Sequence, residues 1–539
     1  MLWFLRDYPL AAVVLRAATL AFQSIVIGGL VFCSVILRTT SLEGAFRAKA
    51  RRLIRGASVG LIVTQLVYVS LDSAMLMGTS SLHLADLLTA NYVLAGALAV
   101  VTAVALLWSL HRAAISSSLN WFWFAVPLLV ASVWTSHAAS RLDDRAWLIV
   151  LTGIHQLATA LWIGSLPYIW MFAGLGQDPS ESQAARVDTL RRYSKLALSS
   201  AVALVLAGIG MAYFYVGSWD AVDGTAYGVV LTAKCILLVG LLVVGAGNFF
   251  SIRKFPKSMQ PAFLRICHAT EAEIGIGFTI ILAAASLTSQ PPAVDQVQDR
   301  LTTQEIVARM SPRWPRLTTP SISAMPPVQP MAQAIRNYDP TEDTASSTNN
   351  PTEQAWSEYN HHWAGIVVLL AGICALLARS RKFLWARNWP LVFLGLAIFL
   401  FFRADPEAWP LGPRGFWQSF YNPEDLEHRL YVLLILSFVA FEWGVQTGRI
   451  LSRKAALVFP AVCALGGALL LTHSHSLGDV KDELLAQMTH TAIAICAVFA
   501  GWARWLQLRQ QGRSGRIAAW IWPVCLILIG MILLDYREA

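Results

Sequence analysis

Charged side chains are scarce in this sequence. Asp, Glu, Lys and Arg make up 14% of its 539 residues, whereas soluble domains carry about a quarter. Hydrophobic residues make up 56% of the chain, and the mean hydropathy is +0.55. This shortage of charge excludes an ordinary soluble domain and indicates a membrane protein.

Cysteines at the spacing of a disulfide framework or a metal ribbon are also missing. The seven cysteines are scattered, nearly all of them within apolar runs, and no C-x-x-C occurs. Neither a disulfide scaffold nor a zinc ribbon is therefore indicated.

The formal net charge of +9 raises the possibility of a nucleic-acid partner. The basic residues lie in short runs between apolar stretches, which is the pattern of the cytoplasmic loops of a membrane protein. We therefore expect contact with the lipid bilayer and no binding of nucleic acid.

Apolar stretches long enough to cross a bilayer recur along the chain. A spanning helix needs about 20 mostly apolar residues, and this criterion predicts about fourteen spans in groups of eight and six. The first is too long for a signal-peptide core and is interpreted as a retained span. The fold class is therefore an all-α, polytopic membrane protein, with spans near 9–37, 53–77, 89–110, 121–139, 146–175, 196–217, 225–250, 268–289, 361–378, 388–403, 429–448, 455–472, 485–503 and 517–534.

The distribution of Lys and Arg predicts the orientation of these spans. Alternate short connections hold 26 of these residues, and the opposite short connections together with the termini hold 6. By the positive-inside rule the first set is cytoplasmic. With fourteen spans, both termini are then periplasmic.

One long polar segment separates the two groups of spans. Residues 290–360 contain 10 of the 23 prolines and a polar run at 341–350. Such a segment buries too little apolar area to order itself, so we expect a flexible periplasmic linker at 291–360. It would join an eight-helix domain at 1–290 to a six-helix domain at 361–539.

Two histidines mark the stretch with the most chemical information. His137 ends the fourth span, and His155 lies about nine residues into the fifth, roughly 13 Å below the outer surface. A histidine inside a membrane span is costly and is a functional hypothesis by default. The alternative is an imidazole that joins two helices by a hydrogen bond.

Charged residues inside other spans extend this polar set. Lys234 lies in the seventh span and Glu273 in the eighth, at similar predicted depths. Pairing would offset the cost of either charge alone, and a purely structural ion pair is the alternative. With Asp72 in the second span, these residues predict a polar pathway leading inward from the outer face.

The order of these motifs resembles the CopD copper-resistance family of bacterial inner-membrane proteins. The resemblance rests on Ser136-His137-Ala138, His155-x6-Trp162-Ile-Gly164, Tyr227-Gly228-x5-Lys234-x13-Asn248, and Glu273 in a run closing Leu287-Thr-Ser-Gln-Pro-Pro292. It is strongest over 130–292 and extends plausibly over 1–130. Ser136 stands where the family usually has glycine.

This resemblance implies movement of copper across the cytoplasmic (inner) membrane, with a periplasmic copper-binding partner of the CopC type. It also implies that His137 and His155 handle the metal. The sequence contains no G-x-x-x-x-G-K-[ST] motif and no Asp-Lys-Thr-Gly-Thr motif, so transport would be passive, ion-coupled or dependent on a carrier protein. We therefore expect a metal transporter or conduit rather than an enzyme.

Further candidate ligands lie outside this core. Met75 and Met77, at the outer end of the second span, could accept Cu(I), although methionines that fill gaps in a core are the alternative. The predicted topology places six of the eleven histidines at the outer face of the second domain and predicts a composite copper site there, of undetermined oxidation state. Histidines that solvate helix ends are the alternative to this site, which comprises His361, His362, His428, His473, His475 and His490.

Two other functions fit the same residues. Bis-histidine haem of the b type needs two imidazoles on facing helices at one depth, and His473 or His475 with His362 or His490 meets this condition better than His137 with His155. The protein could instead deliver copper to another membrane enzyme. The sequence does not separate delivery from uptake.

Overall fold

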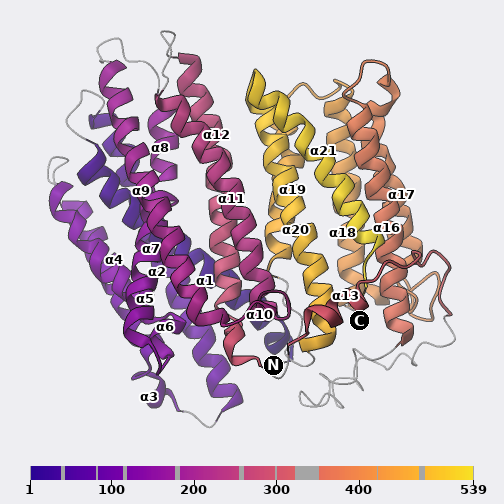
Figure 1. Cartoon of the computed structure of the whole chain (residues 1–539), viewed down its shortest axis with the longest axis horizontal. Helices are drawn as coiled ribbons and strands as arrows, with labels where there is room; N and C mark the ends of the chain where they lie inside the picture. Colours follow the sequence, from indigo (N-terminus) through magenta and orange to yellow (C-terminus); the bar gives the residue numbers. More distant parts are fainter. Residues whose placement is uncertain are drawn as a thin grey trace. The chain divides into compact units, whose positions relative to one another are not determined.

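The computed structural model describes the chain except for several connections and the two ends. In the part that it describes, regular secondary structure is helical and no strand forms (Figure 1). The all-α prediction is therefore confirmed. The described residues are 2–37, 43–80, 83–112, 118–175, 183–253, 260–297, 300–321, 351–421, 423–472 and 480–537.

Helices of membrane-spanning length occur along the whole chain. Twelve described helices are long and apolar enough to cross a bilayer, and Trp121–Trp134 and Ala455–Leu470 are shorter apolar helices. The two shorter helices coincide with the predicted spans at 121–139 and 455–472. Twelve helices are thus candidate spans, whereas the count of fourteen and the orientation of the termini stay predictions.

The chain divides into two compact units. The first comprises Met1–Ala221 and Val230–Asp295, and the second comprises Val222–Val229 and Gln296–Ala539. The division at Asp295 falls close to the predicted boundary at 290.

The first unit is a bundle arranged around its first helix. α1 packs against α2, α7 and α12, α7 packs against α9, and α8 packs against α12. The candidate spans at Tyr8–Ile36 and Ala262–Leu287 are the most buried of the twelve, so α1 and α12 form the interior. The helices of this unit are α1 (Leu2–Val31), α2 (Glu43–Thr79), α3 (Leu84–Leu87), α4 (Asn91–Arg112), α5 (Ala125–Trp134), α6 (His137–Ser140), α7 (Arg145–Trp162), α8 (Leu166–Ala173), α9 (Gln183–Val216), α10 (Asp220–Asp223), α11 (Ala226–Arg253) and α12 (Gln260–Leu287).

The fifth predicted span is broken in its middle. α7 ends at Trp162 and α8 begins at Leu166, and the break at Gly164 lies directly against α1. A Cβ added to Gly164 would lie 2.0 Å from the carbonyl oxygen of Ser24, so only glycine allows this approach. The Ser165 hydroxyl then donates to the Gly28 carbonyl at 3.2 Å, which fixes the break in place.

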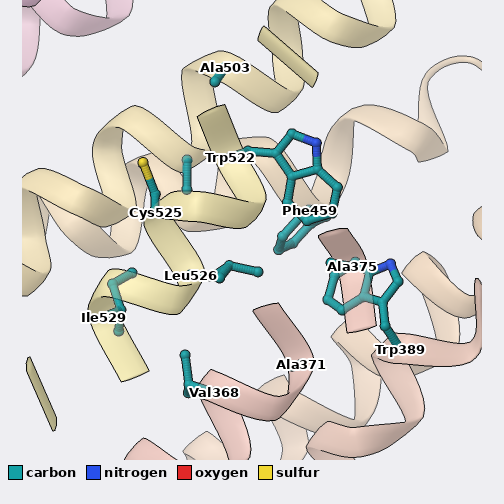
Figure 2. Packing of buried hydrophobic residues seen from close by; sticks show 11 residues of the cluster. Val368, Ala371, Ala375, Trp389, Phe459, Ala503, Trp522, Cys525, Leu526 and Ile529 are labelled. Atoms are coloured by element: carbon teal, nitrogen blue, oxygen red, sulfur yellow. The ribbon is translucent and has the colours of Figure 1, made fainter. Parts of the chain in front are cut away.

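The second unit is built around an aromatic core. Trp389, Phe459 and Trp522 meet with ring centroids 5.4–6.0 Å apart, and Ala371 and Ala375 make room for them (Figure 2). α21 packs against α16 and α20, and α19 packs against α20. The helices of this unit are α13 (Thr303–Arg309), α16 (Pro351–Leu377), η5 (Leu384–Val392), α17 (Phe393–Arg403), η6 (Gln418–Tyr421), α18 (Pro423–Gln446), η7 (Ala455–Leu457), α19 (Val458–Leu470), α20 (Val480–Arg509) and α21 (Arg513–Leu534).

Part of the segment expected to be a flexible linker is ordered. Leu301 is fully buried, and its backbone N–H donates to the Gly224 carbonyl at 3.1 Å. Thr302 and Glu305 close a capping box at the start of α13. The capping box and the burial of Leu301 and Ile306 within the second unit order the beginning of this segment. Residues 322–350 lie outside the described part of the chain.

A buried ion pair joins two helices of the second unit. Glu442 on α18 has a side chain only 1% exposed and accepts from Arg504 of α20 at 3.0 Å. Gln446 also donates to Glu442 at 2.6 Å. The structure shows that Glu442 neutralises a buried arginine.

Because removing one partner of such a pair leaves a buried charge alone, Arg504→Met should destabilise the protein by about 3–5 kcal/mol. Thermal unfolding of the purified protein in detergent measures this effect. The double variant Arg504→Met with Glu442→Met should lose much less, since no charge remains buried. Arg513→Met, which alters an exposed arginine, is the control. Equal unfolding temperatures for Arg504→Met and Arg513→Met would contradict the assigned role of the pair.

Candidate functional site

His155 lies at the interface between α7 and α9. Its Nδ1 is 3.1 Å from the carbonyl oxygen of Leu204. A carbonyl only accepts, so Nδ1 must donate, and the proton of the neutral ring is therefore on Nδ1. The lone pair on Nε2 is then available to a metal ion, which is the usual arrangement of a metal-binding histidine.

Gly208 makes room for this imidazole. A Cβ added to Gly208 would lie 3.5 Å from Cε1 of His155, so alanine would just fit and a larger side chain would displace the ring. One turn further along α9, Met211 accepts a hydrogen bond from Thr152 at 3.4 Å. The interface of α7 and α9 is therefore polar at two successive turns.

Lys234 of α11 is close enough to His155 for its charge to act on the imidazole. In the described parts of the two units, no carboxylate forms a salt bridge with this lysine. The predicted pair of Lys234 and Glu273 is not formed.

Glu273 of α12 instead accepts a hydrogen bond from the Asn248 amide. Asn248 is about four helical turns, or roughly 21 Å, beyond Lys234 along α11. The prediction failed because depth was counted from estimated span ends, and the register between α11 and α12 differs from that estimate.

A cavity of about 240 Å³ adjoins Glu273. It lies within the first unit, and most of its lining is apolar. The Tyr193 hydroxyl beside it donates to the Trp162 carbonyl at 3.1 Å. The polar residues that line the cavity are Tyr193, Ser194, Asn248, Thr270 and Glu273.

His137 opens α6, in the connection between α5 and α7. Its imidazole donates toward the backbone carbonyl of Thr288, while its Nε2 is buried and has no hydrogen-bond partner. Burial lowers the pKa of His137, and the nearby Arg16 and Arg141 act in the same direction. His137 is therefore neutral at pH 7 and, like His155, carries a free lone pair on Nε2.

A buried network close to His137 contains an arginine that the sequence analysis missed. Arg16 lies inside the first span, is 8% exposed and donates to the Thr135 carbonyl at 3.4 Å. Asp72 lies near Arg16 and accepts from the Tyr8 hydroxyl at 2.8 Å. The sequence signal that could have identified Arg16 is its position as a lone charged residue within a long apolar run. Asp72 thus belongs to a polar network with Tyr8 and Arg16, and its role in a polar pathway stays a prediction.

Met75 and Met77 lie on α2. Met77 is 41% exposed, and Met75 is partly buried. Their role as soft-metal ligands stays a prediction.

Two of the six histidines of the second unit come together. The rings of His361 on α16 and His490 on α20 have centroids 5.9 Å apart. Tyr536 stacks on His361 at 3.8 Å and lies 5.9 Å from His490. Nδ1 of His361 lies 2.8 Å from the Ser357 carbonyl, so the tautomer is the same as in His155.

The other histidines of this unit have different surroundings. His362 is fully buried. Its Nδ1 accepts from the Arg316 backbone N–H at 2.7 Å, and its Nε2 lies 3.1 Å from the Tyr536 carbonyl. Both nitrogens are used, so in this arrangement His362 offers no lone pair to copper or haem. His428 pairs with Asp405. His473 and His475 lie outside the described residues.

No ready-made metal centre is present among the residues that the structure describes. Groups of three or more His, Cys, Asp or Glu side chains that could hold a metal ion are absent there. The arrangement is instead a series of separate imidazoles, of which His137 and His155 belong to one unit. Such an arrangement suits an ion that moves from ligand to ligand better than one held permanently.

These features define the class: a multi-pass membrane protein with isolated metal-type ligands in its helix interfaces. Comparison with known proteins relates part of the chain to one family within this class. Residues 187–287 match the family model of copper resistance protein D (CopD). The protein is therefore a multi-pass bacterial membrane protein that carries a CopD-family domain, as the motifs predicted.

A relative found in a separate comparison is also named for copper. The chain is 28% identical over 206 residues to a protein of Bacillus subtilis (strain 168) named copper transport protein CutJ. The alignment covers 37% of this chain and 36% of the relative. No solved structure matches the chain.

The lowered pKa of His137 can be tested by histidine NMR in detergent. We expect its titration midpoint below the ordinary value of about 6.5. Because the folded-state pKa is below the unfolded one, the unfolded chain binds more protons as the pH falls, and acidification should destabilise the fold. A midpoint at or above the ordinary value would contradict the buried, neutral ring.

Two neighbours give this test an internal control. Arg141 lowers the pKa of His137 and Asp295 raises it, and the two form a salt bridge at 3.1 Å. Arg141→Gln should therefore shift the midpoint upward and Asp295→Asn should shift it downward. His137→Gln identifies the signal.

Proposed function

We propose that this protein takes up copper at the periplasmic face of the cytoplasmic membrane and moves it into or across the bilayer through the first unit. The observation that carries the proposal is the shared state of His137 and His155. In each ring Nδ1–H donates a hydrogen bond to a backbone carbonyl, which leaves the lone pair of Nε2 as a neutral ligand. Imidazole in this state suits copper.

The position of the family match supports copper as the cargo. Residues 187–287 include α9, whose Leu204 and Gly208 hold His155 in place. The same residues include Asn248 and Glu273 at the cavity. The part of the chain that resembles copper resistance proteins is thus the part that surrounds the polar interior, and the Bacillus relative is named for copper transport.

The charge of Lys234 would weaken the binding of a metal ion to His155. A metal ion on His155 would share its surroundings with the ammonium group of Lys234, which repels cations. Conduction requires binding that is favourable enough for entry and weak enough for release. Lys234 therefore keeps copper from being trapped at His155.

The first step of the proposed route, binding of copper at the periplasmic face, depends on the predicted orientation of the spans. By the positive-inside pattern His137 would lie on the periplasmic side. His155 lies ten residues into α7, about 15 Å along the helix from its start at Arg145. His361 and His490 would collect copper on the same side in the second unit. A periplasmic copper carrier of the CopC type would deliver the ion to these histidines.

Copper accumulation in cells tests the proposal. Loss of a residue that only supports a ligand costs roughly 10–100-fold in metal affinity, so His155→Ala should lower accumulation at least about ten-fold. His83→Ala, which removes an exposed histidine, is the matched control and should leave accumulation unchanged. Immunoblots of the membranes show that the variants are equally abundant.

A glycine pair tests the same geometry without removing the imidazole. Gly208→Ala should be tolerated, because its Cβ makes an ordinary contact with the ring. Gly208→Leu should displace His155 and reduce accumulation to the level of His155→Ala. Wild-type accumulation in both His155→Ala and Gly208→Leu would refute the route.

A further inference from the structure

A second kind of polar site lies deeper in the first unit, at Glu273. Its residue is 4% exposed, and one carboxylate oxygen accepts from the Asn248 amide. The other oxygen lies beside Gly245 and takes no hydrogen bond from any described residue. The carboxyl group therefore borders the cavity with one oxygen bound to the Asn248 amide and the other oxygen without a hydrogen bond from the described residues.

No positive charge neutralises this carboxyl group in the described part of the bundle. The groups that face it are the Trp162 indole from α7, Tyr193 from α9, Asn248 from α11 and Thr270 from α12. Only Tyr193 among them is titratable. An ionised carboxylate without a partner is costly inside a bilayer, so the site needs a cation of its own.

The chemistry of the cavity selects the proton as that cation. Copper prefers imidazole and sulfur ligands, and the polar lining here offers oxygen and amide groups. A metal ion bound by oxygen takes about six ligands, whereas most of this lining is apolar. A proton needs only the single oxygen that Glu273 leaves free.

We infer that Glu273 carries a proton that is exchanged for copper, so that the entry of copper is coupled to the release of a proton to the opposite side. This inference rests on the proposed copper transport. α7, α9 and α11 supply groups both to the surroundings of His155 and to the cavity. A movement of these helices that releases copper would also change the access of Glu273 to water.

The exchange balances without any redox step. Glu273 as a neutral acid releases one proton to one side of the membrane and becomes a carboxylate. It regains one proton from the other side after copper has moved in the opposite direction. For Cu(I), one ion for one proton moves no net charge.

Proteoliposomes that contain the full-length protein test this coupling. Copper is supplied as the acetonitrile complex of Cu(I) or, in a second series, as Cu(II) chloride, and a trapped dye reports internal pH. With the interior one pH unit more acidic, one-for-one exchange supports about ten-fold accumulation of Cu(I). We expect liposomes that contain the wild-type protein to accumulate copper while the pH inside them rises.

Three carboxyl variants decide the role of Glu273. Glu273→Gln should abolish gradient-driven accumulation and the pH change, and Glu273→Asp should retain both at a lower rate. Glu271→Gln is the matched control, since Glu271 lies two residues away and accepts from the Trp170 indole at 3.2 Å. Gradient-driven accumulation by Glu273→Gln, or copper uptake by the wild type without proton movement, would overturn the inference. Uptake without proton movement would leave copper transport itself standing.

Infrared difference spectroscopy in detergent separates this inference from the proposed transport. Addition of Cu(I) to the wild type should remove the band of a protonated carboxyl group, and Glu273→Gln should lack that band. If liposomes took up no copper but the band changed, transport would be refuted and proton release from Glu273 would stand. A spectrum with no protonated carboxyl band would refute the inference.

Discussion

The hydrogen bond between His155 and the Leu204 carbonyl determines what the polar interior of the first unit can do. In an α-helix that carbonyl already accepts from the N–H of residue 208. The imidazole reaches it because residue 208 is a glycine. The bond selects the tautomer, and the tautomer decides that Nε2 offers a lone pair. The helix break at Gly164 and its contact with α1 help to hold α7 against this partner.

Polar groups inside the bundles find different solutions to the same constraint. Within a bilayer, a polar group without a partner costs several kcal/mol. Arg504 and Glu442 satisfy each other, and Arg16 lies beside Asp72 and the Thr135 carbonyl. His137, His155 and Glu273 each keep one atom unengaged by the described residues. An unengaged imidazole nitrogen can bind a metal ion and an unengaged carboxylate oxygen can bind a proton, and this chemistry marks the three groups as candidate transport residues. Lack of a partner alone does not, because Nε of Arg504 also has none among the described residues.

Sequence patterns were reliable where they depended on local composition. The apolar runs predicted the positions of the helices, and the spacing around His137 and His155 indicated the family that the comparison shows for 187–287. Patterns failed where the outcome depended on helix register or on contacts distant in the chain. Lys234 and Glu273 were predicted to lie at one depth, yet the partner of Glu273 in the structure is the Asn248 amide. His361 and His362 are neighbours in sequence, but His362 uses both nitrogens in hydrogen bonds.

The sequence by itself determined that the chain enters a membrane, where most helices lie and which histidines interrupt apolar runs. Hydrophobic length and charge bias act residue by residue, so they can be read without a structure. Only the tertiary structure decided which nitrogen of His155 is free, that Glu273 borders a cavity with no basic side chain among its described lining residues, and that residues 300–321 belong to the second unit. These outcomes depend on which atoms of separate helices come within hydrogen-bonding distance. Composition carries no information about such distances.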